Sequence, residues 1–243
     1  MKTLLLVMLA HDFWIEPATF TPRAGQIVPV RLRVGQDLLG DPVARDPSLL
    51  RDFVVHDGAD RKSLPGRDGA DPAGYLRIEA DGLAVVGYAS HPSAAELPAD
   101  KFNQYLKEEG LDSIPRQSAS PVRERFSRCA KSLVLAGAAK PVQTDRLLGM
   151  TLELLAEKNP YALRAGDELP VRLMFENRPI AGTLVVAMNR ANPAEKQSAR
   201  TDAHGRVRFR LPNPGLWLIK AVHMTGGPAG WTSYWASLTF ERK

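Results

Sequence analysis

The residues whose types and spacing could do chemistry stand close together near the start of the chain. His11 and Asp12 are followed by two aromatic residues, an isoleucine and Glu16. A lysine and the apolar run of residues 4–10 precede them, in the order of a secretory signal that ends at a small residue. Cleavage after this run would make His11 the first residue of the mature chain. Its amine and imidazole would then bind Cu(II) or Ni(II) as one chelate, and Asp12 or Glu16 would add an oxygen.

A chelate of this kind needs a second residue. The α-amino group has an unperturbed pKa of about 7.7–8.0, so a metal displaces its proton near neutral pH. Two nitrogens leave Cu(II) or Ni(II) incompletely coordinated, and His223 is the best partner because it follows a predicted buried strand, residues 216–222. The competing interpretations are a frayed first residue for His11 and a satisfied core histidine for His223. The predicted metal ligands are His11, His223, Asp12 and Glu16.

The composition is that of an ordinary globular protein and argues against several functions. Of the 243 residues, 44% are apolar and 24% are charged, which suits a chain that buries a core. The net charge of +5 comes from basic residues scattered among acids, so we expect no nucleic-acid partner. The chain has no G-x-S-x-G, P-loop or dinucleotide-binding pattern, so we expect no enzyme. Beyond the first ten residues, no run reaches the roughly 18 apolar residues of a membrane span.

An internal repeat predicts the architecture. RAGQIVPVRL at residues 23–32 corresponds to RAGDELPVRL at residues 164–173, an offset of 141 positions at which Phe20 also matches Tyr161. In each copy apolar residues alternate with polar ones, the period of a half-buried strand. Turns with glycine, proline and aspartate separate further short strands, which indicates β-sandwiches. We therefore expect residues 28–34 and 169–175 to occupy equivalent positions in two related domains.

The fold class predicted is mainly β, with two β-sandwich domains of immunoglobulin or prealbumin type and a short helical insertion. Residues 99–109 read as one helix and residues 121–132 as a second, with Cys129, the lone cysteine, buried in it as a packing residue. A flexible linker is expected over residues 136–146. The predicted divisions are a signal-like segment at 1–10, an N-terminal sandwich at 11–135 with its insertion at about 99–132, a linker at 136–149 and a C-terminal sandwich at 150–243.

Two further groups of side chains could form surfaces. Arg206, Arg208 and Arg210 point to one side of a predicted strand, as an anion-binding or partner surface or as an ordinary solvated face. Four aromatic residues late in the chain could form a carbohydrate platform, although packing in a sandwich is the default. They are Trp217, Trp231, Tyr234 and Trp235.

Seven motifs carry a resemblance to a known family. In chain order they are HDFWIEP, KFNQYLKEEGL, RFSRCAKSLV, LELLAEKNPYAL, RTDAHGRVRFRLP, WLIKAVHM and WASLTFE. The chain resembles bacterial periplasmic proteins of unknown function that are described as periplasmic components of cobalt/nickel ABC-type uptake systems. Its later part is similar to the carboxypeptidase regulatory-like, prealbumin-like sandwich. Where relatives tend to have tyrosine, this chain has Phe126.

These observations lead to one expected function and two alternatives. We expect an exported, periplasmic protein that binds nickel, cobalt or copper and assists an inner-membrane metal transport complex, the partner that the resemblance implies. The first alternative is a mono-copper enzyme that uses a histidine brace on an envelope substrate. The second is a structural or carbohydrate-binding module of the envelope.

Overall fold

The computed structural model describes residues 11–138, 143–164, 166–227 and 230–242, so the predicted signal segment lies outside the described residues. The first half forms β1 (Asp12–Pro17), β2 (Ile27–Gln36), β3 (Leu39–Val43), β4 (Leu50–Asp57), β5 (Asp60–Ser63), β6 (Gly74–Arg77), β7 (Gly82–Ser90), β8 (Ser93–Leu97), α2 (Ala99–Glu108) and β9 (Val122–Ala136). The second half forms β10 (Leu152–Ala156), the 3-10 turn η1 (Pro160–Ala162), β11 (Glu168–Phe175), β12 (Arg178–Pro179), β13 (Leu184–Asn189), β14 (Asn192–Arg200), β15 (Arg206–Arg210), β16 (Gly215–Gly227) and β17 (Gly230–Arg242).

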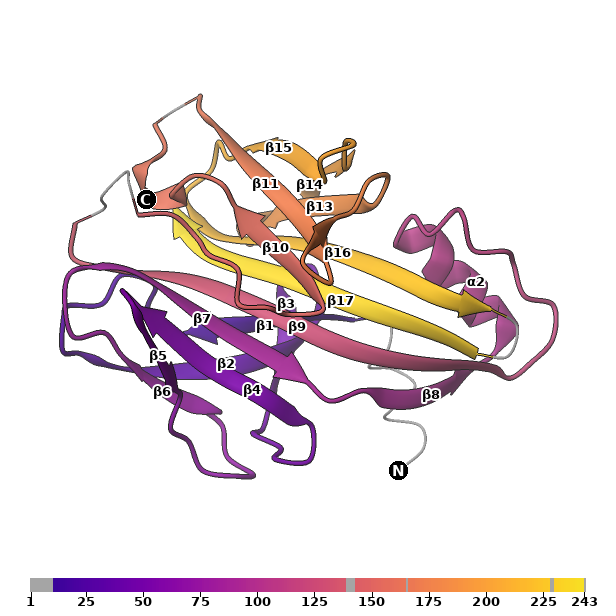
Figure 1. Ribbon diagram of the computed structural model, residues 1–243, viewed down its shortest axis with the longest axis horizontal. Helices are drawn as coiled ribbons and strands as arrows, with labels where there is room; N and C mark the ends of the chain where they lie inside the picture. The colour runs from indigo at the N-terminus through magenta and orange to yellow at the C-terminus, as the bar shows by residue number, and fades with distance from the viewer. Residues whose placement is uncertain (1–10, 139–142, 165, 228–229, 243) are drawn as a thin grey trace.

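The described strands make two small sheets and one long one. The N-terminal sheet contains β1, β2, β3 and β6, and the C-terminal sheet contains β10, β11, β12 and β15. The shared sheet has the order β14-β13-β16-β17-β9-β7-β4-β5, with β8 beside β9, so both halves of the chain contribute to it. Figure 1 shows β17 and β9 side by side through the middle of the molecule, where they pair in parallel. The predicted mainly-β sandwich fold is confirmed.

The two small sheets cover opposite faces of the shared sheet. Ala84 and Val86 of β7 pack with the core of the N-terminal sheet, whereas Leu83 and Val85 pack with the core of the C-terminal sheet. Successive side chains of a strand point to opposite faces, so the two cores lie on the two sides of β7. Every residue of β7 is accordingly buried, and the strand reads as a near-continuous apolar run.

The repeat occupies equivalent positions in the two halves, as predicted. β2 pairs with β1, β3 and β6, and β11 pairs in the same way with β10, β12 and β15. The amide of Gln26 donates to the carbonyl of Arg23, and the amide of Asp167 donates to that of Arg164, at 3.1 Å in both cases. The register of the first pair differs by two residues, because Ile15 faces Leu32 while its counterpart, residue 156, faces residue 171. A two-residue shift keeps every side chain on its original face, so the core pattern survives.

The strands of the shared sheet also occupy equivalent positions in the two halves of the chain. From its outer edge inward, one half contributes β5, β4, β7 and β9, and the other contributes β14, β13, β16 and β17. The innermost strands, β9 and β17, are parallel neighbours. An approximate two-fold axis along this pair relates the halves, and such an axis places the two small sheets on opposite faces.

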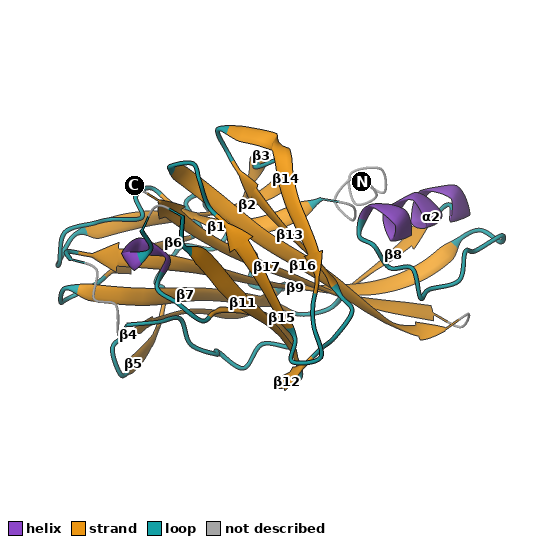
Figure 2. Ribbon diagram, turned by 90° about the horizontal axis from the view of Figure 1, so that it is seen from above, coloured by secondary structure: helices purple, strands orange, loops and turns teal. Residues whose placement is uncertain are grey.

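One predicted helix is wrong and the other is confirmed. Residues 99–108 form α2, at one end of the shared sheet beside β8 (Figure 2). Residues 122–136 form the strand β9 instead of a helix. Pairing with β7 on one side and β17 on the other makes this segment a strand. Cys129 is buried in this strand, so its predicted packing role is confirmed.

A buried group of ions holds the described end of the predicted linker. Lys131 of β9 is 1% exposed, and its Nζ lies 2.7 Å from Asp145 Oδ1 and 3.1 Å from Glu153 Oε1. The same ammonium donates to the carbonyl of Arg146 at 2.7 Å. A buried charge of this kind requires close partners, so it fixes the chain that follows β9. The remainder of the predicted linker, residues 139–142, lies outside the described residues, and the division into domains stays a prediction.

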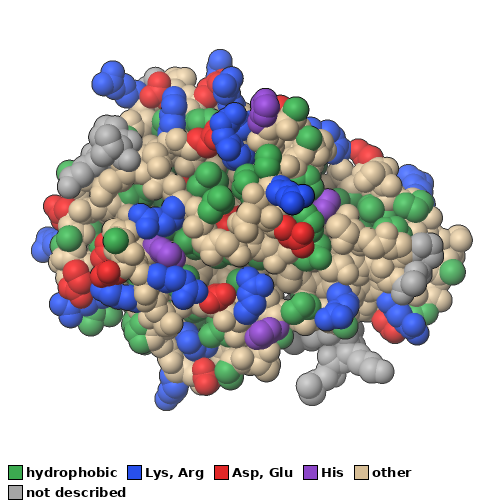
Figure 3. Space-filling model, in the orientation of Figure 1, with side chains coloured by type: hydrophobic (Ala, Val, Ile, Leu, Met, Phe, Trp, Pro, Cys, Tyr) green, Lys and Arg blue, Asp and Glu red, His purple; other side chains and the backbone are tan. Residues whose placement is uncertain are grey.

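Charges are interspersed on the surface, as the sequence suggested. Figure 3 shows acidic and basic side chains alternating over the face in view. None of the helices in the described ranges is long and apolar enough to span a membrane.

Candidate functional site

Strand β1 places the predicted ligands at the head of a rigid element. It pairs antiparallel with β2 from Asp12 opposite Gly35 to Pro17 opposite Val30. The hydroxyl of Thr239 donates to the carbonyl of Ile15 at 2.8 Å and ties β1 to β17. The residue that precedes β1 is therefore attached to the middle of the molecule.

His11 is half-buried directly before β1. Its Nδ1 is buried and has no hydrogen-bond partner among the described residues. A buried polar atom without a partner needs an explanation such as an ion or a water molecule. Nδ1 is also the ring nitrogen nearer to the main chain, which suits a chelate formed together with the amine of the same residue.

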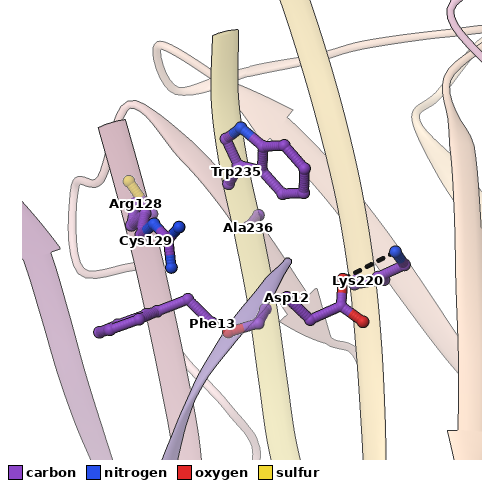
Figure 4. A pocket seen from close by; sticks show the side chains of 8 residues that line it. Asp12, Phe13, Arg128, Cys129, Lys220, Trp235 and Ala236 are labelled. Carbon is purple, nitrogen blue, oxygen red and sulfur yellow. Dashed lines mark ion pairs between the residues drawn. The ribbon is translucent and has the colours of Figure 1, made fainter. Parts of the chain in front are cut away.

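Asp12 belongs to a buried group of ions that sequence reasoning missed. Lys220 Nζ of β16 lies 2.7 Å from Asp12 Oδ1 (Figure 4). It also lies 2.9 Å from Oε1 of Glu109, the residue just past α2. Burial raises the pKa of Glu109, and the Lys220 ammonium opposes that rise. Burial disfavours the charged ammonium of Lys220, but Asp12 and Glu109 together raise its pKa above the ordinary value. Lys220 thus remains a cation that joins β1, β16 and the end of α2.

A narrow cavity adjoins this group. Its lining includes Asp12, Phe13, Arg128, Lys220 and Trp235, and it has room for about one water molecule. The guanidinium of Arg128 lies 5.1 Å from the ring centroid of Phe13, a cation–π contact. Burial lowers the pKa of Arg128 to about 10, so the side chain is still charged at neutral pH. The cavity is too small for an organic substrate.

Glu16 is already held by cations. Its carboxylate accepts a hydrogen bond from Trp14 Nε1 at 2.9 Å and lies 2.5 Å from Arg190 Nη2. Arg33 approaches the other oxygen at 3.9 Å. Burial raises the pKa of Glu16, but the bonds from Arg190 and Trp14 bring it below its ordinary value. A metal would have to displace these partners to gain an oxygen from Glu16.

His223 lies on the other face of the shared sheet. The strand predicted to end there continues to Gly227, and His223 is paired inside it with Tyr234. Its ring centroid lies 4.6 Å from that of Phe175 in the C-terminal sheet. Burial lowers the pKa of His223.

Alternation along β16 explains the separation. Lys220 and His223 are three positions apart, so their side chains point to opposite faces, and Asp12 lies with Lys220. The structure therefore does not bring His223 together with Asp12. In the described ranges, no group of three or more histidine, cysteine, aspartate or glutamate side chains is placed to hold a metal.

The sequence does contain a sign of the buried ion group of Asp12, Lys220 and Glu109. Lys220 interrupts the apolar run LWLIKAVHM, and Glu109 is the last residue of the predicted helix. A lysine within a buried strand requires an acidic partner, but the sequence does not show which acid reaches it.

Arg206, Arg208 and Arg210 of β15 line an open groove together with Glu157 and Glu168. Arg206 Nε lies 3.0 Å and 2.8 Å from the two oxygens of Glu157, and Arg210 Nε lies 3.4 Å from Glu168. Carboxylates in the groove thus neutralise two of the three arginines, which favours the interpretation as a solvated face.

The fold and this site describe a β-sandwich protein with its candidate chemistry at the head of its first strand. The profile of the family described as "Domain of unknown function (DUF4198)" matches residues 8–225, and the chain belongs to that family. The expected membership of a family of unknown function is confirmed. The expected link with metal uptake stays a prediction.

Other comparisons give only remote likenesses. No curated protein sequence matches the chain. The D0-D1 domain of intimin is similar at 14% identity, with 94% of this chain and 97% of that chain covered and a TM-score of 0.23. A tetra-tandem repeat from the extending region of a large adhesion protein is similar at 11% identity, with 96% and 49% covered and a TM-score of 0.27. Likeness at this level carries no information about function.

Proposed function

We propose that the protein is an exported, non-catalytic binding protein that handles a transition metal, nickel, cobalt or copper, through His11. The observation that supports this proposal is the buried Nδ1 of His11, which has no hydrogen-bond partner in the described residues. Once the preceding residues are removed, the free amine and Nδ1 form a two-nitrogen chelate that suits Cu(II) and Ni(II). The site of cleavage and the periplasmic location are parts of this proposal.

The surroundings favour a site that exchanges its metal. The Asp12 carboxylate is paired with Lys220, and the Glu16 carboxylate is paired with Arg190. Neither carboxylate is therefore free to complete the coordination of a metal on His11. His223 faces the other side of the shared sheet. A metal on His11 would keep open positions, which a partner can fill during transfer. The partner proposed is an inner-membrane metal transport complex that supplies the remaining ligands.

The experiment compares two forms of the protein, one that begins at His11 and one that retains the residues before it. Calorimetric titration with Cu(II), Ni(II) and Co(II) is expected to show one site in the first form, and binding at least tenfold weaker in the second and in His11→Ala. His91→Ala, at an exposed histidine, is the matched control.

The contrary outcomes are equally specific. Equal affinity in both forms, or undiminished affinity in His11→Ala, would remove His11 from the site. Copper-dependent consumption of peroxide by the form that begins at His11 would replace the binding role with a mono-copper enzyme. Glycan binding that needs no metal would favour the envelope-module alternative.

A further inference from the structure

Helix α2 covers the end of the shared sheet with its apolar face. Phe102 and Tyr105 are buried against the sheet, Phe102 with its ring centroid 6.2 Å from that of Trp231. The ring of Tyr105 stacks on that of Trp235, with a centroid distance of 5.5 Å and an interplanar angle of 10°. This helix lies on the same face as the N-terminal sheet, because Lys220 joins both Glu109 and Asp12.

A carboxyl group is buried beneath the helix. Glu124 of β9 is 2% exposed, and its Oε1 accepts hydrogen bonds from the hydroxyls of Tyr105, at 3.3 Å, and Ser233. Trp235 Nε1 donates to the Ser233 oxygen at 3.1 Å, so the hydrogen of Ser233 is directed to Glu124. The other oxygen, Oε2, is buried without a hydrogen-bond partner in the described part of the chain.

Among the residues that the structure describes, the groups that face Glu124 provide no positive charge. Tyr105 faces it from α2 and Ser233 from β17, and its neighbours in the pairing register are Trp231 on β17 and Ala95 on β8. Tyr105 is the titratable group among them, and burial raises the pKa of its phenol, so it stays neutral. A negative charge on Glu124 would therefore rest partly on an oxygen with neither a donor nor a cation beside it.

We propose that α2 is a pH-controlled strap: a proton on Glu124 keeps the helix closed on the sheet, and loss of that proton loosens it. Opening lets water reach the carboxylate, and it also separates Glu109 from Lys220 beside β1. The test of this device needs no metal, so its outcome can be distinguished from that of the metal-binding proposal.

The direction of the effect follows from burial. Burial raises the pKa of Glu124 from 4.5 to about 7, and the hydrogen bonds from Ser233 and Tyr105 oppose the rise. In the open state the carboxyl is exposed to water and regains a pKa near its ordinary value. The closed state thus binds the proton more tightly, so it is favoured at acid pH and loses that advantage as pH rises through about 7.

Hydrogen exchange over residues 99–111 tests the strap in the full chain. After correction for intrinsic rates, opening is expected to increase on the order of tenfold between pH 5.5 and pH 8 in the wild type. Glu124→Gln keeps a neutral group at the site and is expected to lose most of this pH dependence, with the remainder due to Glu109, whose pKa burial also raises. Glu108→Gln, at an exposed position of α2, is the matched control and should follow the wild type.

A second variant separates titration from simple packing. Ser233→Ala removes a bond that lowers the pKa of Glu124, so the midpoint of the opening should move to higher pH. A flat profile in the wild type, or the same pH dependence in Glu124→Gln, would overturn the proposal. An unmoved midpoint in Ser233→Ala, with the fold intact by circular dichroism, would assign the effect to another group and would also overturn it.

Discussion

The hydroxyl oxygen of Tyr161 lies 3.4 Å from the main-chain oxygen of Phe20, the residue that holds the equivalent place in the first half of the chain. The same hydroxyl donates to the carbonyl of Leu133 in β9 at 2.7 Å. The two copies of the repeat therefore meet at their matching residues, and a tyrosine of the second half donates a hydrogen bond to a strand of the first half.

Tyr161→Phe should destabilise the whole protein. It leaves the Leu133 carbonyl without this donor in a buried setting, a loss of about 1–2 kcal/mol in the free energy of unfolding. Urea denaturation followed by tryptophan fluorescence measures the change. Tyr75→Phe, at a tyrosine that is 42% exposed, should change little and serves as the control. Equal effects in both variants would contradict the role given to the Tyr161 hydroxyl.

Lys131→Met should be among the most damaging single changes. It removes the cation between Asp145 and Glu153, and breaking a buried pair in this way costs roughly 3–5 kcal/mol. Thermal unfolding measures the loss of stability. Lys62→Met, on the exposed strand β5, is the control and should show no such loss. Adding Asp145→Asn and Glu153→Gln to Lys131→Met should recover part of the stability. No recovery would mean that packing, and not charge, explains the position.

Lys220→Met should destabilise the protein in a pH-dependent manner. Without the ammonium, Asp12 and Glu109 are two buried carboxylates with no shared cation, at a cost of roughly 3 kcal/mol near neutral pH. Burial raises the pKa of Glu109, so protonation of this carboxyl should shrink the difference from the wild type as pH falls. Unfolding curves at several pH values test this. A difference that is constant with pH would argue against the ionic role.

Glu16 should contribute stability that disappears in acid. Its pKa in the folded protein is below the ordinary 4.5, so the folded state favours the ionised form. The contribution is present above about pH 4.5 and is lost as pH falls through the lower folded-state pKa. Glu16→Gln should cost about 1 kcal/mol at pH 7 and less at pH 3. Glu195→Gln, on the exposed strand β14, is the control.

Much of the fold follows from the sequence because its signals are local. The alternation in residues 28–34 and 169–175 and the repeated RAG turn lead to equivalent strands. The helix predicted over residues 121–132 is wrong because β7 and β17, which are distant in the sequence, pair with this segment and make it a strand.

The site was harder to predict because its contacts cross the fold. The Asp12–Lys220 contact and the Thr239–Ile15 bond that anchors β1 each join residues more than two hundred positions apart. The face to which His223 points depends on where β16 ends, and a prediction that stops the strand at residue 222 leaves that side chain free to turn. Pairing of buried charges is a rule of chemistry, but the choice of partner is a property of the three-dimensional arrangement.

The parallel contact of β9 and β17 has a consequence for cutting the chain. A break within residues 139–142 would leave two fragments, each with one of these long strands as an open edge. An exposed edge has unpaired backbone N–H and C=O groups that can bond to another strand, so each fragment alone should aggregate or dimerise through this edge. Expressed together, the fragments should find one another and behave as a split protein, whose reassembly reports on whether its two parts share a compartment.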